Sequence, residues 1–227
     1  GDQCGQVRRR ENGAGPVIRL WCFDLDGTLI DSCGDLTAAV NHMRALLALP
    51  PLPDAAVMPM LGNGMLKLTE RALADAPAGT DIKAAMAQLR DYYLAHSAEC
   101  TRLYPNVVET LARLHASGAM LAVVTNKIAA AAERVLAELG LAELFDRVVG
   151  DGCGCRLKPE PDALLMLMKE FGIRPDETAM VGDNDTDLAA ARAAGVKRVF
   201  AAYGYGDRRG EGYDAAIHQF AELENIS

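Results

Sequence analysis

The sequence predicts an α/β fold with a Rossmann-like parallel sheet core, helices on both faces of the sheet, and an inserted all-helical cap domain. Short apolar runs alternate with amphipathic helical stretches between about residues 106 and 202, as in a parallel sheet joined by crossover helices. A further apolar run at residues 17–25 is separated from them by residues 32–103, which contain no convincing strand. Half of the 227 residues are apolar, which is ample material for a buried core.

The first strand is predicted at residues 17–25. This run is rich in β-branched and aromatic residues and leads into the polar residues 24–28, as expected for a buried strand with a polar end. Residues 1–16 before it are polar, glycine-rich and basic, without the apolar centre of a secretory signal. We expect these residues to form a flexible leader.

Residues 32–103 interrupt the alternation of strands and helices, and they are predicted to form the cap. The segment Gly62-Asn63-Gly64 is expected to open one of its helices. Apolar side chains at helical spacing predict two other helices, with Leu36, Val40, Met43 and Leu47 in the first and Ile82, Ala85, Met86, Leu89 and Tyr93 in the second. The α/β core is then discontinuous, with residues 17–31 before the cap and 104–227 after it.

After residue 104 the predicted elements follow one another in regular order. Apolar runs predict strands at residues 119–124, 147–149, 178–181 and 196–201. Helical stretches lie between and after them, at residues 106–117, 128–139, 161–171 and 185–194. The second and the fourth helix are followed by glycine, which commonly ends helices.

The amino-acid composition argues against some classes of binding partner and indicates the cellular compartment. A net charge of −8 argues against nucleic acid or an anionic membrane, because either would need a positive surface. No apolar run approaches the ~20 residues of a membrane helix. The six cysteines are scattered, and a chain of this size needs no disulfides, so a reducing cytoplasm is expected. Cys153 and Cys155 lack two further ligands at zinc-finger spacing, so we expect two thiols on a loop.

Two carboxylates follow the first predicted strand. Asp24 and Asp26 stand two residues apart, and such residues share one face of an extended strand, so both side chains should point into one site. Gly27 lets the chain turn away without a side chain in the approach. A carboxylate can attack phosphorus where its repulsion from phosphate is offset, and a second acid can protonate the leaving oxygen. The motif alone is also compatible with a surface turn.

Two further motifs are expected at the same edge, because ligands bind at the carboxyl ends of parallel strands. Thr125 and Asn126 can donate hydrogen bonds to phosphate oxygens, and Lys127 can add positive charge, although Thr and Asn are also common helix caps. Lys158 offers a point charge next to a transferring phosphoryl group. Either motif by itself is weak, since capping residues and surface lysines are common.

Three acids follow the strand predicted at residues 178–181. They suggest a site for a hard cation such as Mg²⁺, which takes one or two carboxylates and keeps several waters. We expect Asp183 to bind the metal, Asp187 to hold the site together, and Asp185 to cap the next helix. Asp24 in contact with a phosphate dianion would be repelled by on the order of several kcal/mol. The metal ion and Lys158 are what would permit that approach.

In order along the chain, these motifs resemble those of the haloacid dehalogenase superfamily of phosphohydrolases. The matching residues are Asp24-x-Asp26-Gly27-Thr28, Thr125-Asn126, Lys158 and Gly182-Asp183-x-x-x-Asp187. The predicted insertion also stands where that family carries a helical cap. The resemblance implies that Asp24 is a nucleophile that forms an aspartyl-phosphate, and that Asp26 is the general acid and then the base that activates water.

The resemblance also implies roles for the other motif residues. Mg²⁺ would be held by the Asp24 carboxylate, the Asp26 backbone carbonyl and Asp183. The phosphoryl oxygens would be held by Thr125, Asn126 and Lys158, and the supporting residues would be Gly27, Thr28 and Asp187.

Within the superfamily, several stretches are similar to bacterial phosphoglycolate phosphatases. They are residues 23–32, 62–64, 70–73, 125–127 and 203–206. This likeness implies that the cap binds a second, short anionic group of the substrate. The candidates for that contact are Asn63, Lys67, Arg71 and Arg102, although each of them taken singly fits a solvated helix surface better.

The expected function is therefore Mg²⁺-dependent hydrolysis of a small phosphorylated metabolite, most of all phosphoglycolate. Phosphatases of sugar phosphates, pyrophosphate or nucleotides would share the core, as would a β-phosphoglucomutase-like phosphomutase. A true dehalogenase is disfavoured because Asp26 supplies an acid that a halide leaving group does not need. A phospho-acceptor signalling module is the non-enzyme alternative, but receiver domains are usually shorter and lack a helical cap.

Overall fold

The computed structural model describes residues 17–226, so the leader predicted at residues 1–16 lies outside the described residues. Within that range the strands are β1 (Leu20–Phe23), β2 (Ile30–Asp31), β3 (Arg102–Leu103), β4 (Met120–Ile128), β5 (Arg147–Asp151), β6 (Thr178–Gly182), β7 (Lys197–Ala201) and β8 (Ala215–Ile217). The α-helices are α1 (Cys33–Leu46), α2 (Asp54–Val57), α3 (Gly64–Ala72), α4 (Ile82–Ala95), α5 (Val107–Ala116), α6 (Ala129–Glu138), α7 (Asp162–Phe171) and α8 (Asp185–Ala194). Short 3₁₀ helices are η1 (Met58–Met60), η2 (Ala142–Leu144), η3 (Pro175–Glu177) and η4 (Phe220–Asn225). No helix of the described part is long and apolar enough to cross a membrane.

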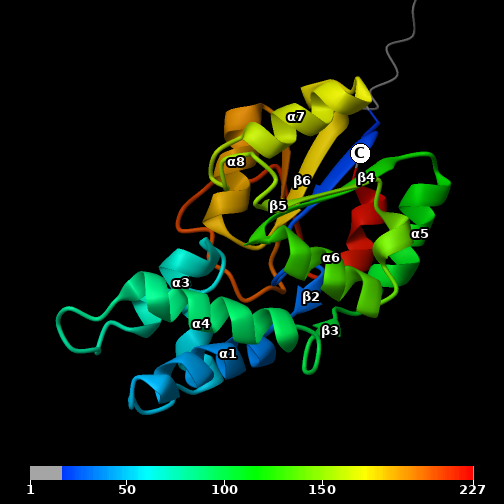
Figure 1. Cartoon of the computed structure of the whole chain (residues 1–227). Coiled ribbons are helices and arrows are strands. Elements are labelled where there is room, and N and C mark those ends of the chain that lie inside the picture. Colours follow the sequence, from blue (N-terminus) through cyan, green and yellow to red (C-terminus); the bar gives the residue numbers. More distant parts are fainter. Residues whose placement is uncertain (1–16, 227) are drawn as a thin grey trace, which may run out of the picture.

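Six strands form one parallel sheet in the order β5-β4-β1-β6-β7-β8. From β1 the chain builds the sheet first in one direction, through β4 and β5, and then in the other, through β6, β7 and β8 (Figure 1). The strand β1 therefore lies where the direction of growth reverses. Open parallel sheets bind their ligands at this point, beyond the carboxyl ends of the strands.

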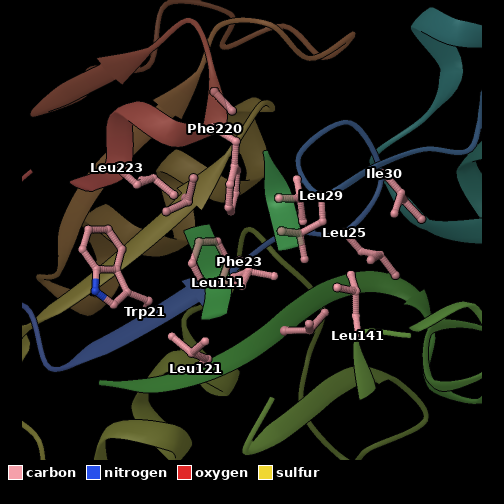
Figure 2. Close-up of a cluster of buried hydrophobic side chains, with 14 of the residues drawn as sticks. Trp21, Phe23, Leu25, Leu29, Ile30, Leu111, Leu121, Leu141, Phe220 and Leu223 are labelled. Atoms are coloured by element: carbon pink, nitrogen blue, oxygen red, sulfur yellow. The ribbon is translucent and has the colours of Figure 1, made fainter. Parts of the chain in front are cut away.

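Side chains of β1 alternate between two hydrophobic cores, one on each face of the sheet. Trp21 and Phe23 point to the face covered by α5, α6 and η4, where Phe23 lies 5.6 Å from Phe220 between ring centroids (Figure 2). Leu20 and Cys22 point to the other face and pack in the cluster formed with α7 and α8. Because β1 is buried on both faces, its sequence is a continuous apolar run.

The helices α1 to α4 gather beyond one end of the sheet (Figure 1) and build a third hydrophobic cluster of their own. Met43, Leu89 and Tyr93 are fully buried in it. Arg44 is buried beside them, and its guanidinium donates to the two carboxylate oxygens of Asp75 at 2.7 and 2.8 Å. The buried charge is therefore paired, as stability requires.

The two connections between this helical insertion and the sheet run side by side. The strands β2 and β3 pair antiparallel, with Ile30 opposite Leu103. In the first turn of α1, Asp35 accepts hydrogen bonds from the backbone N–H groups of Cys100 at 2.8 Å and Thr101 at 2.9 Å. The two chain segments that link the insertion to the sheet are thus held together by β2–β3 pairing and by the hydrogen bonds of Asp35.

The predicted fold class is confirmed, and each strand and helix predicted between residues 104 and 202 is present. The prediction that residues 32–103 contain no strand is wrong for β3. Both β2 and β3 have only two residues, too few for an alternating pattern to be visible in the sequence. The short strand β8 was not predicted, and β4 runs to Ile128, beyond its predicted end at residue 124.

Candidate active site

Polar side chains from three neighbouring strands meet at the C-terminal edge of the sheet. Asp24 directly follows β1, and its backbone N–H donates to the carbonyl of Val181 in β6 at 2.9 Å. Thr125 and Asn126 lie in β4, on one side of β1, and Asp183 follows β6, on the other side. The pairing of the strands thus brings all three motifs around Asp24.

Lys158 lies between two carboxylates of this group. Its Nζ is 2.8 Å from Asp24 Oδ1 and 2.7 Å from Asp187 Oδ1, and it donates to the carbonyl of Val124 at 2.6 Å. The Lys158 side chain is only 3% exposed. Burial alone would lower the pKa of Lys158, but the charges of Asp187 and Asp24 outweigh it and raise that pKa, so the cation is retained.

Asp24, Asp183 and Asp187 form a buried carboxylate group with the composition of a metal site. One oxygen of each lies within 4.8 Å of the others. Burial and the charges of Asp24 and Asp187 raise the pKa of Asp183 well above its ordinary value, and burial and the charge of Asp24 raise the pKa of Asp187 to about 7. Among residues 17–226, Lys158 is the one cation in contact with this group, so the negative charge is incompletely balanced.

Donors from the surrounding loops hold these acids in place. Thr28 Oγ1 donates to Asp183 Oδ1 at 3.3 Å, and the backbone N–H of Gly206 donates to Asp183 Oδ2 at 2.7 Å. The backbone N–H of Asn184 donates to Asp187 Oδ2 at 3.0 Å. One Asp187 oxygen thus accepts a hydrogen bond from this N–H, and the other forms the ion pair with Lys158.

Glycines at positions 27, 204 and 206 make room for Asp183. Gly27 has φ +87°, in the left-handed region that other residues rarely adopt. A Cβ at Gly27 would collide with the Asp183 carboxylate, and so would a Cβ at Gly204. The sequence motif therefore needs glycine at position 27 both for its turn and for this close approach.

Asp26 belongs to a different network from Asp24. Its Oδ1 accepts hydrogen bonds from Ser32 Oγ and from Lys127 Nζ, the latter at 2.7 Å. Ser32 Oγ also lies 3.3 Å from the hydroxyl of Tyr205. The two carboxylates of one short motif thus have different partners, which is how neighbouring acids acquire different roles.

Asn126 uses its side chain to hold two loops. Its Nδ2 donates to the carbonyl of Lys158 at 2.9 Å and to the carbonyl of Gly62 at 3.0 Å, and its Oδ1 accepts from the N–H of Lys158 at 2.8 Å. The Gly62 loop of the insertion is so close to the core that a Cβ there would collide with Asn184. These contacts position Lys158, while phosphate binding by Asn126 stays a prediction.

A cavity adjoins Asp24 and Asp26, between the sheet edge and the helical insertion. The space open to the centre of a water-sized sphere is about 50 Å³, and all empty space out to the open mouth is about 510 Å³. The sheet side supplies polar groups from Thr125, Asn126 and Lys127. The insertion supplies mainly apolar groups, from Leu36, Leu61, Met65, Leu68 and Tyr93.

The polar residues of the insertion that were predicted to bind the substrate do not line this cavity. Lys67 is exposed and pairs with a glutamate one turn away at 2.7 Å. Arg71 donates to a carbonyl of η1 at 2.7 Å, and Arg102 donates to carbonyls just before it in the chain. Asn63 stands between two glycines that do line the cavity but is not part of its wall. Their role in specificity stays a prediction.

The comparisons with known proteins agree with this geometry. Residues 21–201 match the haloacid dehalogenase-like hydrolase family. The chain is 38% identical over 213 residues to a phosphoglycolate phosphatase of Chromobacterium violaceum, covering 92% of this chain and 96% of that protein. It is 41% identical over 196 residues to phosphoglycolate phosphatase 1 of Pseudomonas aeruginosa, covering 84% and 72%. The chain belongs to the haloacid dehalogenase-like hydrolase family.

A solved structure extends this likeness to three dimensions. The crystal structure of a predicted phosphoglycolate phosphatase from Haemophilus somnus has a TM-score of 0.87 to this chain at 34% identity. The match covers 92% of this chain and 97% of that one. The likeness to that structure therefore extends over the helical insertion as well as the sheet.

The site of this haloacid dehalogenase-like hydrolase contains side-chain contacts that the sequence did not predict. Lys127 was noted only as added charge, yet β4 extends past its predicted end and brings Lys127 to Asp26. Ser32 ends one of the stretches similar to phosphoglycolate phosphatases, but the sequence predicts no role for it in the site. Tyr93 was predicted as one of the apolar side chains of a helix, but its ring lies against the Lys127 ammonium, 4.6 Å from Nζ to the centroid.

Proposed function

We propose that this hydrolase is a Mg²⁺-dependent phosphatase that cleaves 2-phosphoglycolate through an aspartyl-phosphate intermediate. The observation that carries the proposal is the Lys158 ammonium, 2.8 Å from Asp24 and 2.7 Å from Asp187, beside the third carboxylate of Asp183. A cation and a site for a second cation flank one carboxylate, which is the arrangement that offsets repulsion between a carboxylate nucleophile and a phosphoryl group.

The first step transfers the phosphoryl group to Asp24. A bond forms between an Asp24 carboxylate oxygen and phosphorus while the bond from phosphorus to the ester oxygen breaks. Asp26, in its protonated form, gives its proton to the departing oxygen, so the product leaves as an alcohol. In this proposal Thr125, Asn126 and Lys158 stabilise the phosphoryl oxygens during transfer.

The second step removes phosphate from Asp24. Asp26, now a carboxylate, takes a proton from the water that attacks phosphorus, and the bond from phosphorus to Asp24 breaks. Orthophosphate leaves, and Asp26 holds a proton again for the next cycle. Ser32 and Lys127 support this role by fixing the Asp26 carboxylate beside Asp24.

A Mg²⁺ ion fits the carboxylate group at the sheet edge, because it is a hard cation that takes carboxylate and carbonyl oxygens. We assign the carboxylates of Asp24 and Asp183 and the backbone carbonyl of Asp26 as its ligands. Asp187 supports the site by holding Lys158. When bound, the ion neutralises negative charge on the phosphoryl oxygens.

We also propose that residues 32–103 act as a cap over a small substrate. Support comes from the apolar wall that this segment gives to the cavity and from the double connection through β2 and β3. A closed cap would exclude bulk water from the aspartyl-phosphate site. Phosphoproteins and long nucleic acids are then excluded by size.

The choice of 2-phosphoglycolate as the substrate is supported by the relatives named phosphoglycolate phosphatase. We expect 2-phosphoglycolate to have the highest kcat/KM in a panel with glucose 6-phosphate, pyrophosphate and a nucleoside monophosphate, measured by phosphate release with Mg²⁺. Release only from another ester would reassign the substrate. Isomerised sugar phosphate without net phosphate release would instead favour a phosphomutase.

Binding of Mg²⁺ is expected to stabilise the folded protein, because it balances the buried carboxylates. At a Mg²⁺ concentration about 100-fold above Kd, the gain is about 2.7 kcal/mol. In a chain of this length that corresponds to a rise in Tm of roughly 5–10 °C. Thermal unfolding in EDTA and in Mg²⁺ measures it, and Asp183→Asn should remove most of the difference. An equal rise in that variant would place the ion elsewhere.

A further inference from the structure

Lys127 is the only basic side chain that lines the active-site cavity within the described range 17–226. Lys158, the other cation of the site, is turned to the carboxylates of Asp24 and Asp187. Lys127 is nearly inaccessible from bulk solvent, with 3% of its side chain exposed. The cavity therefore contains one cation beyond those required to hold the transferring phosphoryl group.

The Lys127 ammonium retains its charge in this position. Its Nζ lies 2.7 Å from Asp26 Oδ1 and 4.6 Å from the centre of the Tyr93 ring. The carboxylate supplies the opposite charge and the aromatic ring a cation–π contact, and both favour the charged form of the lysine. An ammonium has three donor hydrogens, so these two neighbours leave one hydrogen for a further acceptor.

We propose that Lys127 binds the carboxylate of the substrate and thereby determines specificity for a phosphate ester that also carries a carboxylate group. This inference rests on the proposed function, and it names the residue that binds the carboxylate end of the substrate. A carboxylate placed against the apolar wall of Leu61, Met65 and Leu68 would be costly without a cationic partner. Lys127 is the cation that the cavity offers.

The short distance between the ester oxygen and the carboxylate of the substrate agrees with this assignment. In 2-phosphoglycolate a single methylene group separates the ester oxygen from the carboxylate. The general acid Asp26 must approach the ester oxygen to protonate it, and Lys127 is in direct contact with Asp26. One ammonium can therefore contact the acid and the substrate carboxylate together. By contrast, Lys67 and Arg71 of the insertion are turned to partners outside the cavity.

The test compares two phosphate esters that differ only in whether they carry the carboxylate. 2-Hydroxyethyl phosphate has the skeleton of 2-phosphoglycolate with a hydroxymethyl group in place of the carboxylate. The ratio of kcat/KM for the acidic ester to kcat/KM for the neutral one is measured in the wild type and in Lys127→Met. We expect this ratio to fall by about 30-fold or more in the variant, as for loss of one partner of a buried charge pair.

The matched control is Lys83→Met, which makes the same substitution at an exposed position of α4 and should leave the ratio unchanged. Equal losses on both esters in Lys127→Met would overturn the assignment, because they would show that Lys127 acts only by positioning Asp26. Lys127→Arg, which keeps the cation, should keep most of the preference for the acidic ester.

A measurement on the wild type keeps the inference testable if the variants do not fold. The non-hydrolysable 3-phosphonopropionate, which carries a carboxylate, should inhibit more tightly than propylphosphonate, and equal inhibition would contradict the proposal. Failure of the proposed function is distinguishable, since the wild type would then release no phosphate from 2-phosphoglycolate. Wild-type turnover with an unchanged ratio in a folded Lys127→Met would refute only the role of Lys127.

Discussion

Replacing Asp24 with asparagine is expected to lower kcat/KM for phosphate release by at least about 10⁴-fold, as for removal of other catalytic nucleophiles. The amide has no charged oxygen to attack phosphorus, and it loses the ion pair that holds Lys158 at 2.8 Å. Wild-type protein mixed with ³²P-labelled substrate and quenched in acid should carry label on the protein. The variant should carry none.

The matched control for this experiment is Asp151→Asn. Asp151 also ends a parallel strand of the sheet, β5, but it is exposed and lies outside the cavity. This variant should keep the labelled intermediate and nearly all activity. If the Asp24→Asn protein were folded and still labelled, phosphoryl transfer would have to use another nucleophile, and the aspartyl-phosphate mechanism would be wrong.

The sheet was predictable because its strands are buried on both faces and end in polar residues. β1 illustrates the reason: Trp21 and Phe23 enter one core and Leu20 and Cys22 the other, which leaves a continuous apolar run in the sequence. The carboxyl ends of parallel strands must meet at one edge, so Asp24, the C-terminal part of β4 and the residues after β6 had to lie together. Local sequence is sufficient for such inferences.

The partners of individual side chains were not predictable in this way. Asp26 is held by Ser32 and Lys127, of which Lys127 is far away in sequence and comes to Asp26 only because β4 lies next to β1. The side-chain amide of Asn126 donates hydrogen bonds to the backbone carbonyls of Lys158 and Gly62. The contact with Gly62 depends on how the insertion packs against the sheet. Such contacts follow from the packing of distant elements, which local patterns do not record.

Replacing Lys158 with methionine is expected to reduce both activity and stability. Loss of its charge should lower kcat/KM by about 10²–10³-fold, as for other groups that stabilise developing charge. It also leaves the carboxylates of Asp24 and Asp187 buried without their partner. Breaking a buried pair in this way costs about 3–5 kcal/mol, to be measured by urea unfolding in EDTA. Lys169→Met, at an exposed position of α7, is the control.

The pH dependence of this loss separates electrostatics from packing. Asp187 has a pKa of about 7 in the folded protein, raised by burial and by the charge of Asp24, against about 4 in an unfolded chain. The folded state then binds more protons between these values, so this group lowers stability as pH rises through that window. Without Lys158 the repulsion is stronger, and the deficit of Lys158→Met should be larger at pH 8 than at pH 5. Mg²⁺ should reduce it at pH 8, whereas a deficit that ignores both pH and Mg²⁺ would mean that Lys158 acts through packing alone.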